Sequence, residues 1–291
     1  MSGYNVAVVG ATGLIGETII AILEERNFPV ENIVPLASAR SVGREVSYRD
    51  ERIPIVELES FDFGGMDFCF FSAGADISSI FVPIATEQGA IAIDNTSAFR
   101  YEDDVPLVVP EVNADALASY TTRNIIANPN CSTIQLVVAL APIHKIARIK
   151  RINVATYQSV SGAGRQSVEL LNQQIEANLN GIDGNWEQLF AFNVVPQIDA
   201  FQENSFTKEE MKLVWETQKI LNDYDLLVNA TAVRVPVRVG HAEAVNIETE
   251  ISITPDQVKK ILSQSQGIKV IDDVSKSSYP TPRTHGDQTD D

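Results

Sequence analysis

A cysteine in the segment Asn128 to Thr133 is the side chain most able to do chemistry in this 291-residue sequence. Cys131 follows a short apolar run and a turn at Pro129, and it stands just before a predicted helix from Ser132 to His144. A helix N-terminus stabilises a thiolate, and its backbone N–H groups can hold a developing oxyanion. Cys131 is therefore a candidate nucleophile, with a buried, inert cysteine as the alternative. Cys69, inside a predicted strand, is interpreted as a cysteine of that inert kind.

A cysteine nucleophile needs an acid/base partner, and the sequence contains three histidines. His144 ends an apolar helical pattern, where capping the helix is the simpler role. His285 lies near the C-terminus. His241 follows Gly240 between two predicted strands, and it is the candidate by elimination. A loop histidine with an ordinary hydrogen bond remains the alternative.

Two arginines stand where an anion could be bound. Arg100 follows the loop Asp94 to Phe99, which we expect at the carboxyl end of a parallel strand, the edge where ligands bind in such sheets. Arg234 alternates with Ala232 and Pro236 along a predicted strand, so these side chains project to one face. For each arginine the alternative is a surface charge.

A further helix is predicted to begin at the capping box formed by Thr207 and Glu210. Apolar residues then recur on one face as far as Leu221. Glu209 and Lys212 fall on the polar face three residues apart. Their simplest interpretation is a solvated ion pair that contributes roughly a few tenths of a kcal/mol.

A glycine-rich turn, Gly10 to Gly16, joins a predicted strand to a predicted helix. Its three glycines would permit a tight turn, close backbone approach to a pyrophosphate and close packing of helix on strand. Ala11 interrupts the strict dinucleotide spacing, so a purely structural turn is the alternative. After the second predicted strand, Arg40 and Ser41 stand where an NAD enzyme places an acid. They suit the 2′-phosphate of NADP, and an ordinary surface arginine is the alternative.

The elements that must position these residues fall into two patterns. Short apolar runs alternate with helical patterns in the first half, which predicts a Rossmann-like, doubly wound parallel sheet. Beyond about residue 145, residues 149–158, 225–237 and 243–253 alternate apolar and polar side chains, as antiparallel strands with one solvated face do. We therefore predict an NADP-binding domain over residues 1–131, an α+β catalytic and dimerisation domain over residues 132–278, and an unstructured tail over residues 279–291.

Composition narrows the function classes. With 22 Lys and Arg against 39 Asp and Glu, the net charge of −17 argues against nucleic acid or an anionic membrane as the main partner. The longest apolar stretch is far shorter than the roughly 20 residues of a membrane span. The N-terminus lacks a signal-peptide pattern, and two cysteines cannot form a disulfide framework. We expect a cytoplasmic protein that needs no metal.

Taken together, these segments resemble the bacterial aspartate-β-semialdehyde dehydrogenases from Tyr4 to about Pro282. The Asn128 to Gln135 segment distinguishes the chain from the related acetylglutamyl-phosphate reductases. The matching segments occur in the family's order: Gly10 to Gly16, Ser38 to Ser41, Asp94 to Arg100, Val105 to Asn113, Asn128 to Gln135, Thr156 to Gly164, Phe192 to Phe201, Glu209 to Lys212 and Arg234 to Val245.

The resemblance implies an NADP-dependent, reversible reductive dephosphorylation of L-aspartyl-4-phosphate to L-aspartate-4-semialdehyde, with release of inorganic phosphate. This step feeds lysine, diaminopimelate, methionine and threonine synthesis, and the family forms homodimers through its second domain. Carried over by position, Cys131 is the nucleophile that forms a thioester, His241 is the acid/base, and Gln158 orients the substrate. Substrate or its phosphate would be bound by Arg100, Asn130, Glu209, Lys212 and Arg234. The cofactor would be lined by Gly10, Thr12, Gly13, Leu14, Ile15, Gly16, Arg40, Ser41, Ser161 and Gly162.

The chain departs from the family pattern at its C-terminus. Family members continue with a further strand and a last helix, and about one-seventh of their length has no counterpart after Asp291. We therefore expect a C-terminally shortened member whose catalytic residues are present but whose cofactor affinity and stability are reduced. A non-catalytic or impaired paralogue or fragment is the alternative. Acetylglutamyl-phosphate reduction, which differs only in substrate length, is another.

Overall fold

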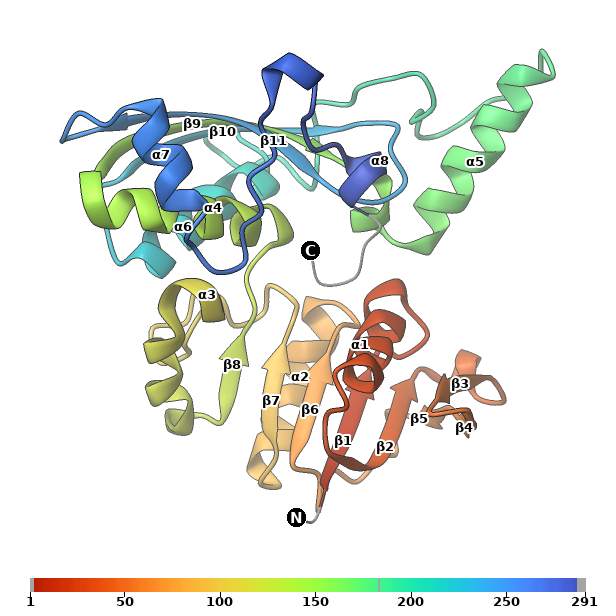
Figure 1. Ribbon diagram of the computed structural model, residues 1–291. Coiled ribbons are helices and arrows are strands. Elements are labelled where there is room, and N and C mark those ends of the chain that lie inside the picture. The colour runs from red at the N-terminus through yellow and green to blue at the C-terminus, as the bar shows by residue number, and fades with distance from the viewer. Residues whose placement is uncertain (1–2, 183, 287–291) are drawn as a thin grey trace. The chain divides into compact units, whose positions relative to one another are not determined.

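The structure is a computed structural model that describes residues 3–182 and 184–286, and the chain divides into two compact units (Figure 1). The units are Met1–Asn130 and Cys131–Asp291. The predicted domains met one residue later, between residues 131 and 132. Each unit is described by itself below.

Unit 1 contains the predicted parallel sheet, in the strand order β5-β2-β1-β6-β7-β8, and every pair in it is parallel. Four successive residues of β1, from Val6 to Val9, are fully buried, as expected for a parallel strand covered on both faces. Figure 1 shows the helices α1 and α2 packed against the sheet. The bounds are β1 Tyr4–Val9, α1 Leu14–Glu25, β2 Val30–Ala37, β5 Val56–Glu57, β6 Phe68–Phe71, α2 Ala75–Glu87, β7 Ile91–Asp94 and β8 Ile125–Ala127.

Shorter elements complete unit 1. A hairpin of β3 (Glu45–Tyr48) and β4 (Glu51–Pro54) turns through Arg49 and Asp50, both with positive φ. The remaining elements are η1 (Ala39–Ser41), α3 (Pro110–Asn113) and η2 (Ala114–Thr122). The doubly wound fold predicted from the alternating patterns is confirmed.

Unit 2 is built on a three-stranded sheet in the order β10-β9-β11. Its strands are β9 (Ile149–Gln158), β10 (Leu227–Arg234) and β11 (Ala242–Thr249). β11 runs antiparallel to β9, as predicted, but β10 runs parallel to β9, so the prediction of antiparallel strands was wrong there. The alternation of apolar and polar side chains shows only that one face of the sheet is buried, and it does not give the direction of a strand. Strand direction is set by the crossover through residues 159–226, which returns the chain to the end where β9 starts.

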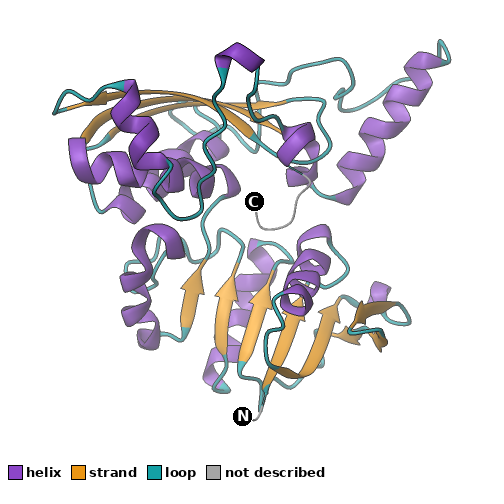
Figure 2. Ribbon diagram, viewed as in Figure 1, coloured by secondary structure: helices purple, strands orange, loops and turns teal. Residues whose placement is uncertain are grey.

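Helices cover one face of this sheet (Figure 2). Leu136 and Leu140 of α4 and Leu213 of α6 pack with Ile152 and Val154 of β9 in a buried core. The other face carries the alternate residues of the strands. The bounds are α4 Cys131–Ala147, η3 Val160–Ala163, α5 Arg165–Leu179, α6 Lys208–Leu221 and α7 Pro255–Leu262.

The predicted tail is partly structured. A 3-10 turn, η4 (Val274–Lys276), precedes it, and α8 (Pro282–His285) lies within it, closed by a capping box between Thr281 and Thr284. The prediction of an unstructured segment was wrong for residues 282–285, because Pro282 stands in the first turn of α8, where a helix tolerates proline. Residues 287–291 lie outside the described residues. In the described part of the chain, helices fall short of the length and apolar character that spanning a bilayer requires.

Candidate active site

Cys131 and His241 meet in unit 2. Cys131 is the first residue of α4, and its Sγ lies 3.3 Å from Nε2 of His241, the residue just before β11. The cysteine is solvent-exposed, whereas much of the imidazole is shielded. A sulfur at the positive end of a 17-residue helix, in contact with an imidazole, has the surroundings of a reactive thiolate. The structure therefore brings together the two residues that the sequence could pair only by elimination.

Ser159, the residue after β9, connects the groups around this pair. Its backbone N–H donates to Nδ1 of His241 over 3.0 Å, and its Oγ lies 3.1 Å from the same nitrogen. Its carbonyl oxygen accepts a 2.7 Å hydrogen bond from Nη1 of Arg234, and its Oγ also contacts Oγ of Ser161. Ser159 itself is fully buried. Sequence reasoning missed this residue, since a serine after a strand has no distinctive signal.

The surroundings favour the neutral form of His241. Burial lowers the pKa of His241, and the positive charge of Arg234 lowers it further. The carbonyl of Gly240 and the carboxylate of Glu209 act in the opposite direction without reversing the shift. Burial and the charge of Arg234 therefore disfavour a proton on the imidazole beside Cys131.

Arg234 is a buried cation at the end of β10 rather than a surface charge. Burial lowers its pKa, while Glu209 and Cys131 oppose that shift. The side chain also lines a cavity of about 530 Å³ together with Ala163, Phe190, Ile198 and Asp199. A guanidinium that faces a cavity and is fixed at one nitrogen by a carbonyl can present its other N–H groups to a carboxylate.

A chain of hydrogen bonds runs from β9 to α6 behind Arg234. Oγ1 of Thr156 donates to Oε1 of Gln158, and Nε2 of Gln158 donates to Oε1 of Glu209 over 3.0 Å. The other oxygen of Glu209 lies 2.9 Å from Nζ of Lys212, which also contacts Asp199 at 3.0 Å. Gln158, Glu209 and Lys212 were predicted as site residues and lie together, whereas Asp199 was missed.

The Glu209–Lys212 pair is not the solvated pair that helix spacing suggested. The exposed fractions of the two side chains are only 6% and 12%. Burial disfavours the Lys212 ammonium, but the adjacent carboxylates outweigh burial and raise the pKa of Lys212. The solvated interpretation was wrong because residues 199–200, distant in sequence, fold over this part of α6.

Arg100 and Asn130 lie in unit 1, and both are buried. Nε of Arg100 donates to the carbonyl of Asn128, and Nη2 donates to the carbonyl of Asn95. Asp94 organises the same loop, because its carboxylate accepts hydrogen bonds from Ser78 and from the backbone and hydroxyl of Thr96. Arg100 is thus held by the loop that follows β7 and the segment that follows β8.

The glycine-rich turn of unit 1 has the close packing that a dinucleotide loop requires. Gly10 has φ +87°, and a Cβ on Gly16 would lie 2.3 Å from the carbonyl oxygen of Gly10. Gly13 precedes α1 as its N-cap without a side-chain cap, and Leu14 and Ile15 form the first helical turn. This arrangement presents backbone N–H groups at a helix N-terminus, which fits a pyrophosphate.

The predicted cofactor residues are divided between the two units. Oγ1 of Thr12 lies 3.5 Å from Oγ of Ser41 in unit 1, and the neighbouring Arg40 is solvent-exposed. Ser161 and Gly162 belong to unit 2. A Cβ on Gly162 would lie 3.2 Å from Nη1 of Arg234 and 3.5 Å from His241, so the glycine keeps this approach to the site open.

The other cysteine and the other two histidines, Cys69, His144 and His285, lie in surroundings that suggest structural rather than catalytic roles. Cys69 is fully buried, and burial raises its pKa to about 12, which fits its interpretation as an inert cysteine. Nδ1 of His144 accepts the backbone N–H of Ile149, so this histidine links the last turns of α4 to the start of β9. His285 lies in α8, with Nδ1 2.7 Å from the hydroxyl of Thr284.

Glu243 is a second residue that sequence reasoning missed. It stands two positions after His241 on β11, and Gln135 stands four positions after Cys131 on α4. Gln135 hydrogen-bonds to the carboxylate of Glu243, but burial dominates and raises the pKa of Glu243 to about 7. Its Oε1 is buried without a hydrogen-bond partner. The period of two along β11 was the signal that could have drawn attention to it.

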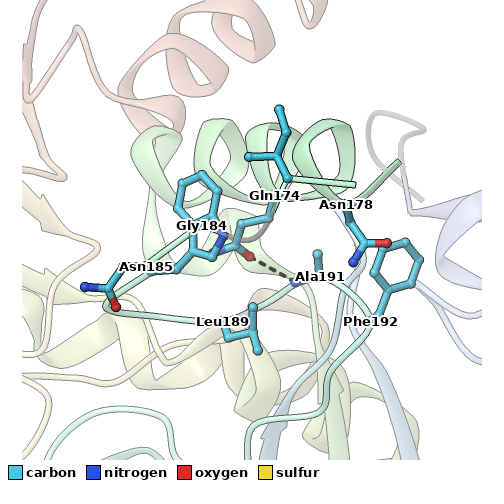
Figure 3. Close-up of a pocket in the computed structure, with 9 residues that line it drawn as sticks. Gln174, Asn178, Gly184, Asn185, Leu189, Ala191 and Phe192 are labelled. Atoms are coloured by element: carbon cyan, nitrogen blue, oxygen red, sulfur yellow. Dashed lines mark hydrogen bonds between the residues drawn. The ribbon is translucent and has the colours of Figure 1, made fainter. Parts of the chain in front are cut away.

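Another cavity of unit 2, of about 430 Å³, lies beside α5 (Figure 3). Gln174 and Phe192 are in its lining, and Oε1 of Gln174 accepts the backbone N–H of Ala191. Its lining includes none of the candidate catalytic residues. Over residues 3–182 and 184–286, clusters of three or more His, Cys, Asp or Glu able to hold a metal are absent.

Two family models match the chain. The model described as "Semialdehyde dehydrogenase, NAD binding domain" matches residues 5–120, and "Semialdehyde dehydrogenase, dimerisation domain" matches residues 140–291. The aspartate-semialdehyde dehydrogenase of Legionella pneumophila is 52% identical over 280 residues, which cover 95% of this chain and 81% of that protein. The chain belongs to the aspartate-semialdehyde dehydrogenase family. It is an oxidoreductase with a nicotinamide-dinucleotide-binding domain, as the sequence predicted.

Solved structures of the family agree in fold. Aspartate semialdehyde dehydrogenase II of Vibrio cholerae, solved in complex with ASA, aligns with a TM-score of 0.93 and 49% identity over 97% of this chain and 84% of that chain. The aspartate semialdehyde dehydrogenase of Candida albicans, solved with NADP, aligns with a TM-score of 0.69 and 26% identity over 91% of this chain and 78% of that chain.

Proposed function

We propose that the chain catalyses the NADP-dependent, reversible reductive dephosphorylation of L-aspartyl-4-phosphate to L-aspartate-4-semialdehyde through a Cys131 thioester. The observation that carries the proposal is the contact of Cys131 Sγ with His241 Nε2 at the N-terminus of α4. The relatives named above are aspartate-semialdehyde dehydrogenases, which supports the substrate.

Cys131 is the group that forms the covalent bond. Its thiolate attacks the acyl carbon, and the bond from that carbon to the phosphate oxygen breaks, which leaves a thioester and inorganic phosphate. When bound beside this thioester, NADPH would supply the hydride that reduces it. His241 then holds the proton at the oxygen of the hemithioacetal, before the carbon–sulfur bond breaks and the aldehyde leaves.

The substrate's amino-acid end is assigned to Arg234 and Glu209. A guanidinium suits a carboxylate, and a carboxylate suits an ammonium group. Gln158 is fixed between them by its hydrogen bond to Glu209 and is assigned to orienting the substrate. Arg100 and Lys212 are assigned to the phosphate, and Asn130, adjacent to the nucleophile, to the substrate.

NADP is the proposed cofactor because Arg40 and Ser41 follow β2 where an NAD-specific site would carry an acid. The turn Gly10 to Gly16 with Thr12, Gly13, Leu14 and Ile15 would hold the pyrophosphate. Ser161 and Gly162 are the other residues assigned to the cofactor. The Candida albicans relative was solved with NADP, which supports the assignment.

A second copy of the chain is the proposed partner. The face of the unit 2 sheet opposite α4 and α6 carries Tyr157, with an exposed fraction of 45%, beside Ala155. The matching family model is described as a dimerisation domain, which supports a homodimer formed through this unit. A cytoplasmic location is proposed because both cysteines are free thiols. The proposed place in metabolism is lysine, diaminopimelate, methionine and threonine synthesis.

The test is reduction of NADP⁺ with aspartate semialdehyde, with and without inorganic phosphate, followed by the absorbance of reduced nicotinamide. Turnover that requires phosphate and is lost in Cys131→Ala but kept in Cys69→Ala would support the proposal. Equal rates with NAD⁺ would contradict the cofactor assignment, and activity in Cys131→Ala would contradict the thioester. Dinucleotide binding without turnover in the native chain would indicate a binding protein instead.

A further inference from the structure

We infer that Glu243 is a positioning residue for the Cys131–His241 pair. Its hydrogen bond to Gln135 ties the start of α4 to β11, and each of these elements carries one member of the pair. The inference deepens the proposed function, since it rests on Cys131 as the nucleophile and His241 as its acid/base partner. It gives a role to a carboxylate and an amide that have none in the reaction described above.

The two hydrogen-bonding residues stand one step along from the reactive pair on both elements. Gln135 follows Cys131 by four positions on α4, about one helical turn, so both side chains lie on the same face of the helix. Glu243 follows His241 by two positions, at the start of β11. The amide of Gln135 donates a hydrogen bond to the carboxylate of Glu243. The two elements are therefore linked immediately beside the contact between sulfur and imidazole.

The register of the sheet explains why Glu243 reaches α4. Glu243 is paired with Thr156 of the antiparallel strand β9, and paired residues project to the same face of a sheet. Thr156 alternates with Ile152 and Val154, whose side chains belong to the core beneath α4 and α6. Glu243 thus faces the helices, although it lies on an edge strand of the sheet.

The position of this carboxylate is unfavourable for stability alone. Within the described part of the chain, Oε1 of Glu243 is buried without a hydrogen-bond partner, and burial raises the pKa of the group to about 7. An apolar side chain of similar size on the same face would avoid both costs. Groups of this kind are frequent where a protein gives up stability for function, and this one lies beside the reactive sulfur.

The contact that this link would maintain depends strongly on distance. An imidazole takes a proton from a thiol only within hydrogen-bonding reach, and Cys131 Sγ lies 3.3 Å from His241 Nε2. Cys131 is the terminal residue of its helix, and helix ends fray more readily than helix centres. A hydrogen bond one turn into α4 opposes that fraying and keeps the sulfur at the imidazole.

The test compares Glu243→Leu with Glu243→Gln. The measurement is the rate of Cys131 alkylation by iodoacetamide across a range of pH, with the labelled cysteine located by mass spectrometry. Both variants lack the carboxylate, and only glutamine can hydrogen-bond to Gln135. We expect Glu243→Gln to react at close to the native rate. Glu243→Leu should react about 10–100-fold more slowly near neutral pH, with the midpoint of its pH profile moved upward. Equal rates in the two variants would overturn the inference.

A variant on the helix side gives an independent comparison, which also serves if Glu243→Leu does not fold. Gln135→Leu, at a partly exposed position of α4, should slow alkylation to a similar extent. Because both changes break one hydrogen bond, the double variant should be no slower than either single variant. Additive losses would show that the two residues act separately and would contradict the inference. Glu248→Leu, which replaces an exposed carboxylate on the same strand, is the control and should react like the native chain.

The alkylation measurements use neither substrate nor cofactor, so they remain interpretable if the proposed turnover is not found. Where turnover is found, Glu243→Leu should lower kcat and leave KM nearly unchanged, because the residue holds the nucleophile and not the substrate. A loss confined to KM would contradict the positioning role while leaving the proposed reaction intact.

Discussion

Glu243 is a carboxylate on strand β11, and the protein buries it although the strand is half-exposed. One carboxylate oxygen is buried without a hydrogen-bond partner, and burial raises the pKa of the group to about 7. The folded chain therefore binds this proton more tightly than the unfolded chain does. The associated stability is present below the ordinary pKa of a glutamate and is lost as the pH rises through about 7.

We predict that Glu243→Gln removes this pH dependence. Between pH about 5 and pH about 8, the free energy of unfolding of the native chain should fall by about 1–3 kcal/mol relative to the variant, the usual cost of an unsatisfied buried group. Urea denaturation at the two pH values measures it. Glu169→Gln, at an exposed position on α5, is the control and should follow the native chain. A native chain that gained stability relative to Glu243→Gln would contradict the assignment.

Single residues also show where sequence reasoning ends. Cys131 could be singled out because a helix start is visible in the sequence, and Cys69 could be set aside because a buried strand is visible too. Ser159 acts through its backbone N–H and carbonyl, which every residue except proline carries. Asp199 meets Lys212 only because a distant loop folds onto α6. Such contacts depend on tertiary structure and leave no local pattern.

At the scale of elements, the glycine-rich turn between β1 and α1 depends on close packing between Gly10 and the first turn of α1. A Cβ at Gly16 would meet backbone atoms of Gly10 and Ala11 at 2.3 Å and 2.8 Å. Backbone atoms cannot move aside as a flexible side chain does. The helix would have to shift, and its N-terminal N–H groups would shift with it.

Gly16→Ala should therefore destabilise the chain by about 1–3 kcal/mol, the usual range for overpacking, and weaken NADP binding. Thermal unfolding and a dinucleotide titration measure the two effects. Gly64→Ala is the matched control, because its Cβ would meet only the side chain of Asp62 at 3.3 Å. A Gly16→Ala protein as stable as Gly64→Ala would show that the loop tolerates the shift.

Helices and strands could be predicted where a local sequence pattern determines them. The strands β1, β2, β6, β7 and β8 and the helices α1 and α2 of unit 1 follow from apolar runs and turns, and the capping box of α6 forms as predicted. The direction of β10 was not predictable from the sequence. Apolar and polar side chains alternate in the same way along any half-buried strand, whether it runs parallel or antiparallel to its neighbour. Helix α8 was not predicted, because a single helical turn is too short to show a periodic pattern.

For the whole molecule, the exposed face of the β10-β9-β11 sheet is the surface proposed to bind a second copy. Tyr157 lies opposite Val233 and Ala242 on that face, so apolar atoms are continuous across three strands. A buried, unpaired charge in such a surface is strongly unfavourable.

Tyr157→Asp should shift the chain from dimer toward monomer, at a cost of roughly 2 kcal/mol or more. Sedimentation at several protein concentrations measures the change. Tyr224→Asp, at another exposed tyrosine that belongs to none of the three strands, should sediment like the native chain. If Tyr157→Asp remains as dimeric as that control, the interface lies elsewhere.

The two backbone hydrogen bonds of Ser159, to His241 and to Arg234, bear on how the site distinguishes substrates of different length. Its amide holds His241 and its carbonyl holds Arg234, so one residue sets the separation between the proton donor and the anchor for the substrate's carboxylate. An acyl phosphate longer by one methylene, held at the same anchor, would overshoot the sulfur. Because a misplacement of about 1 Å at reacting atoms can cost roughly a hundredfold in rate, a fixed span of this kind rejects the longer homologue without any contact made against it.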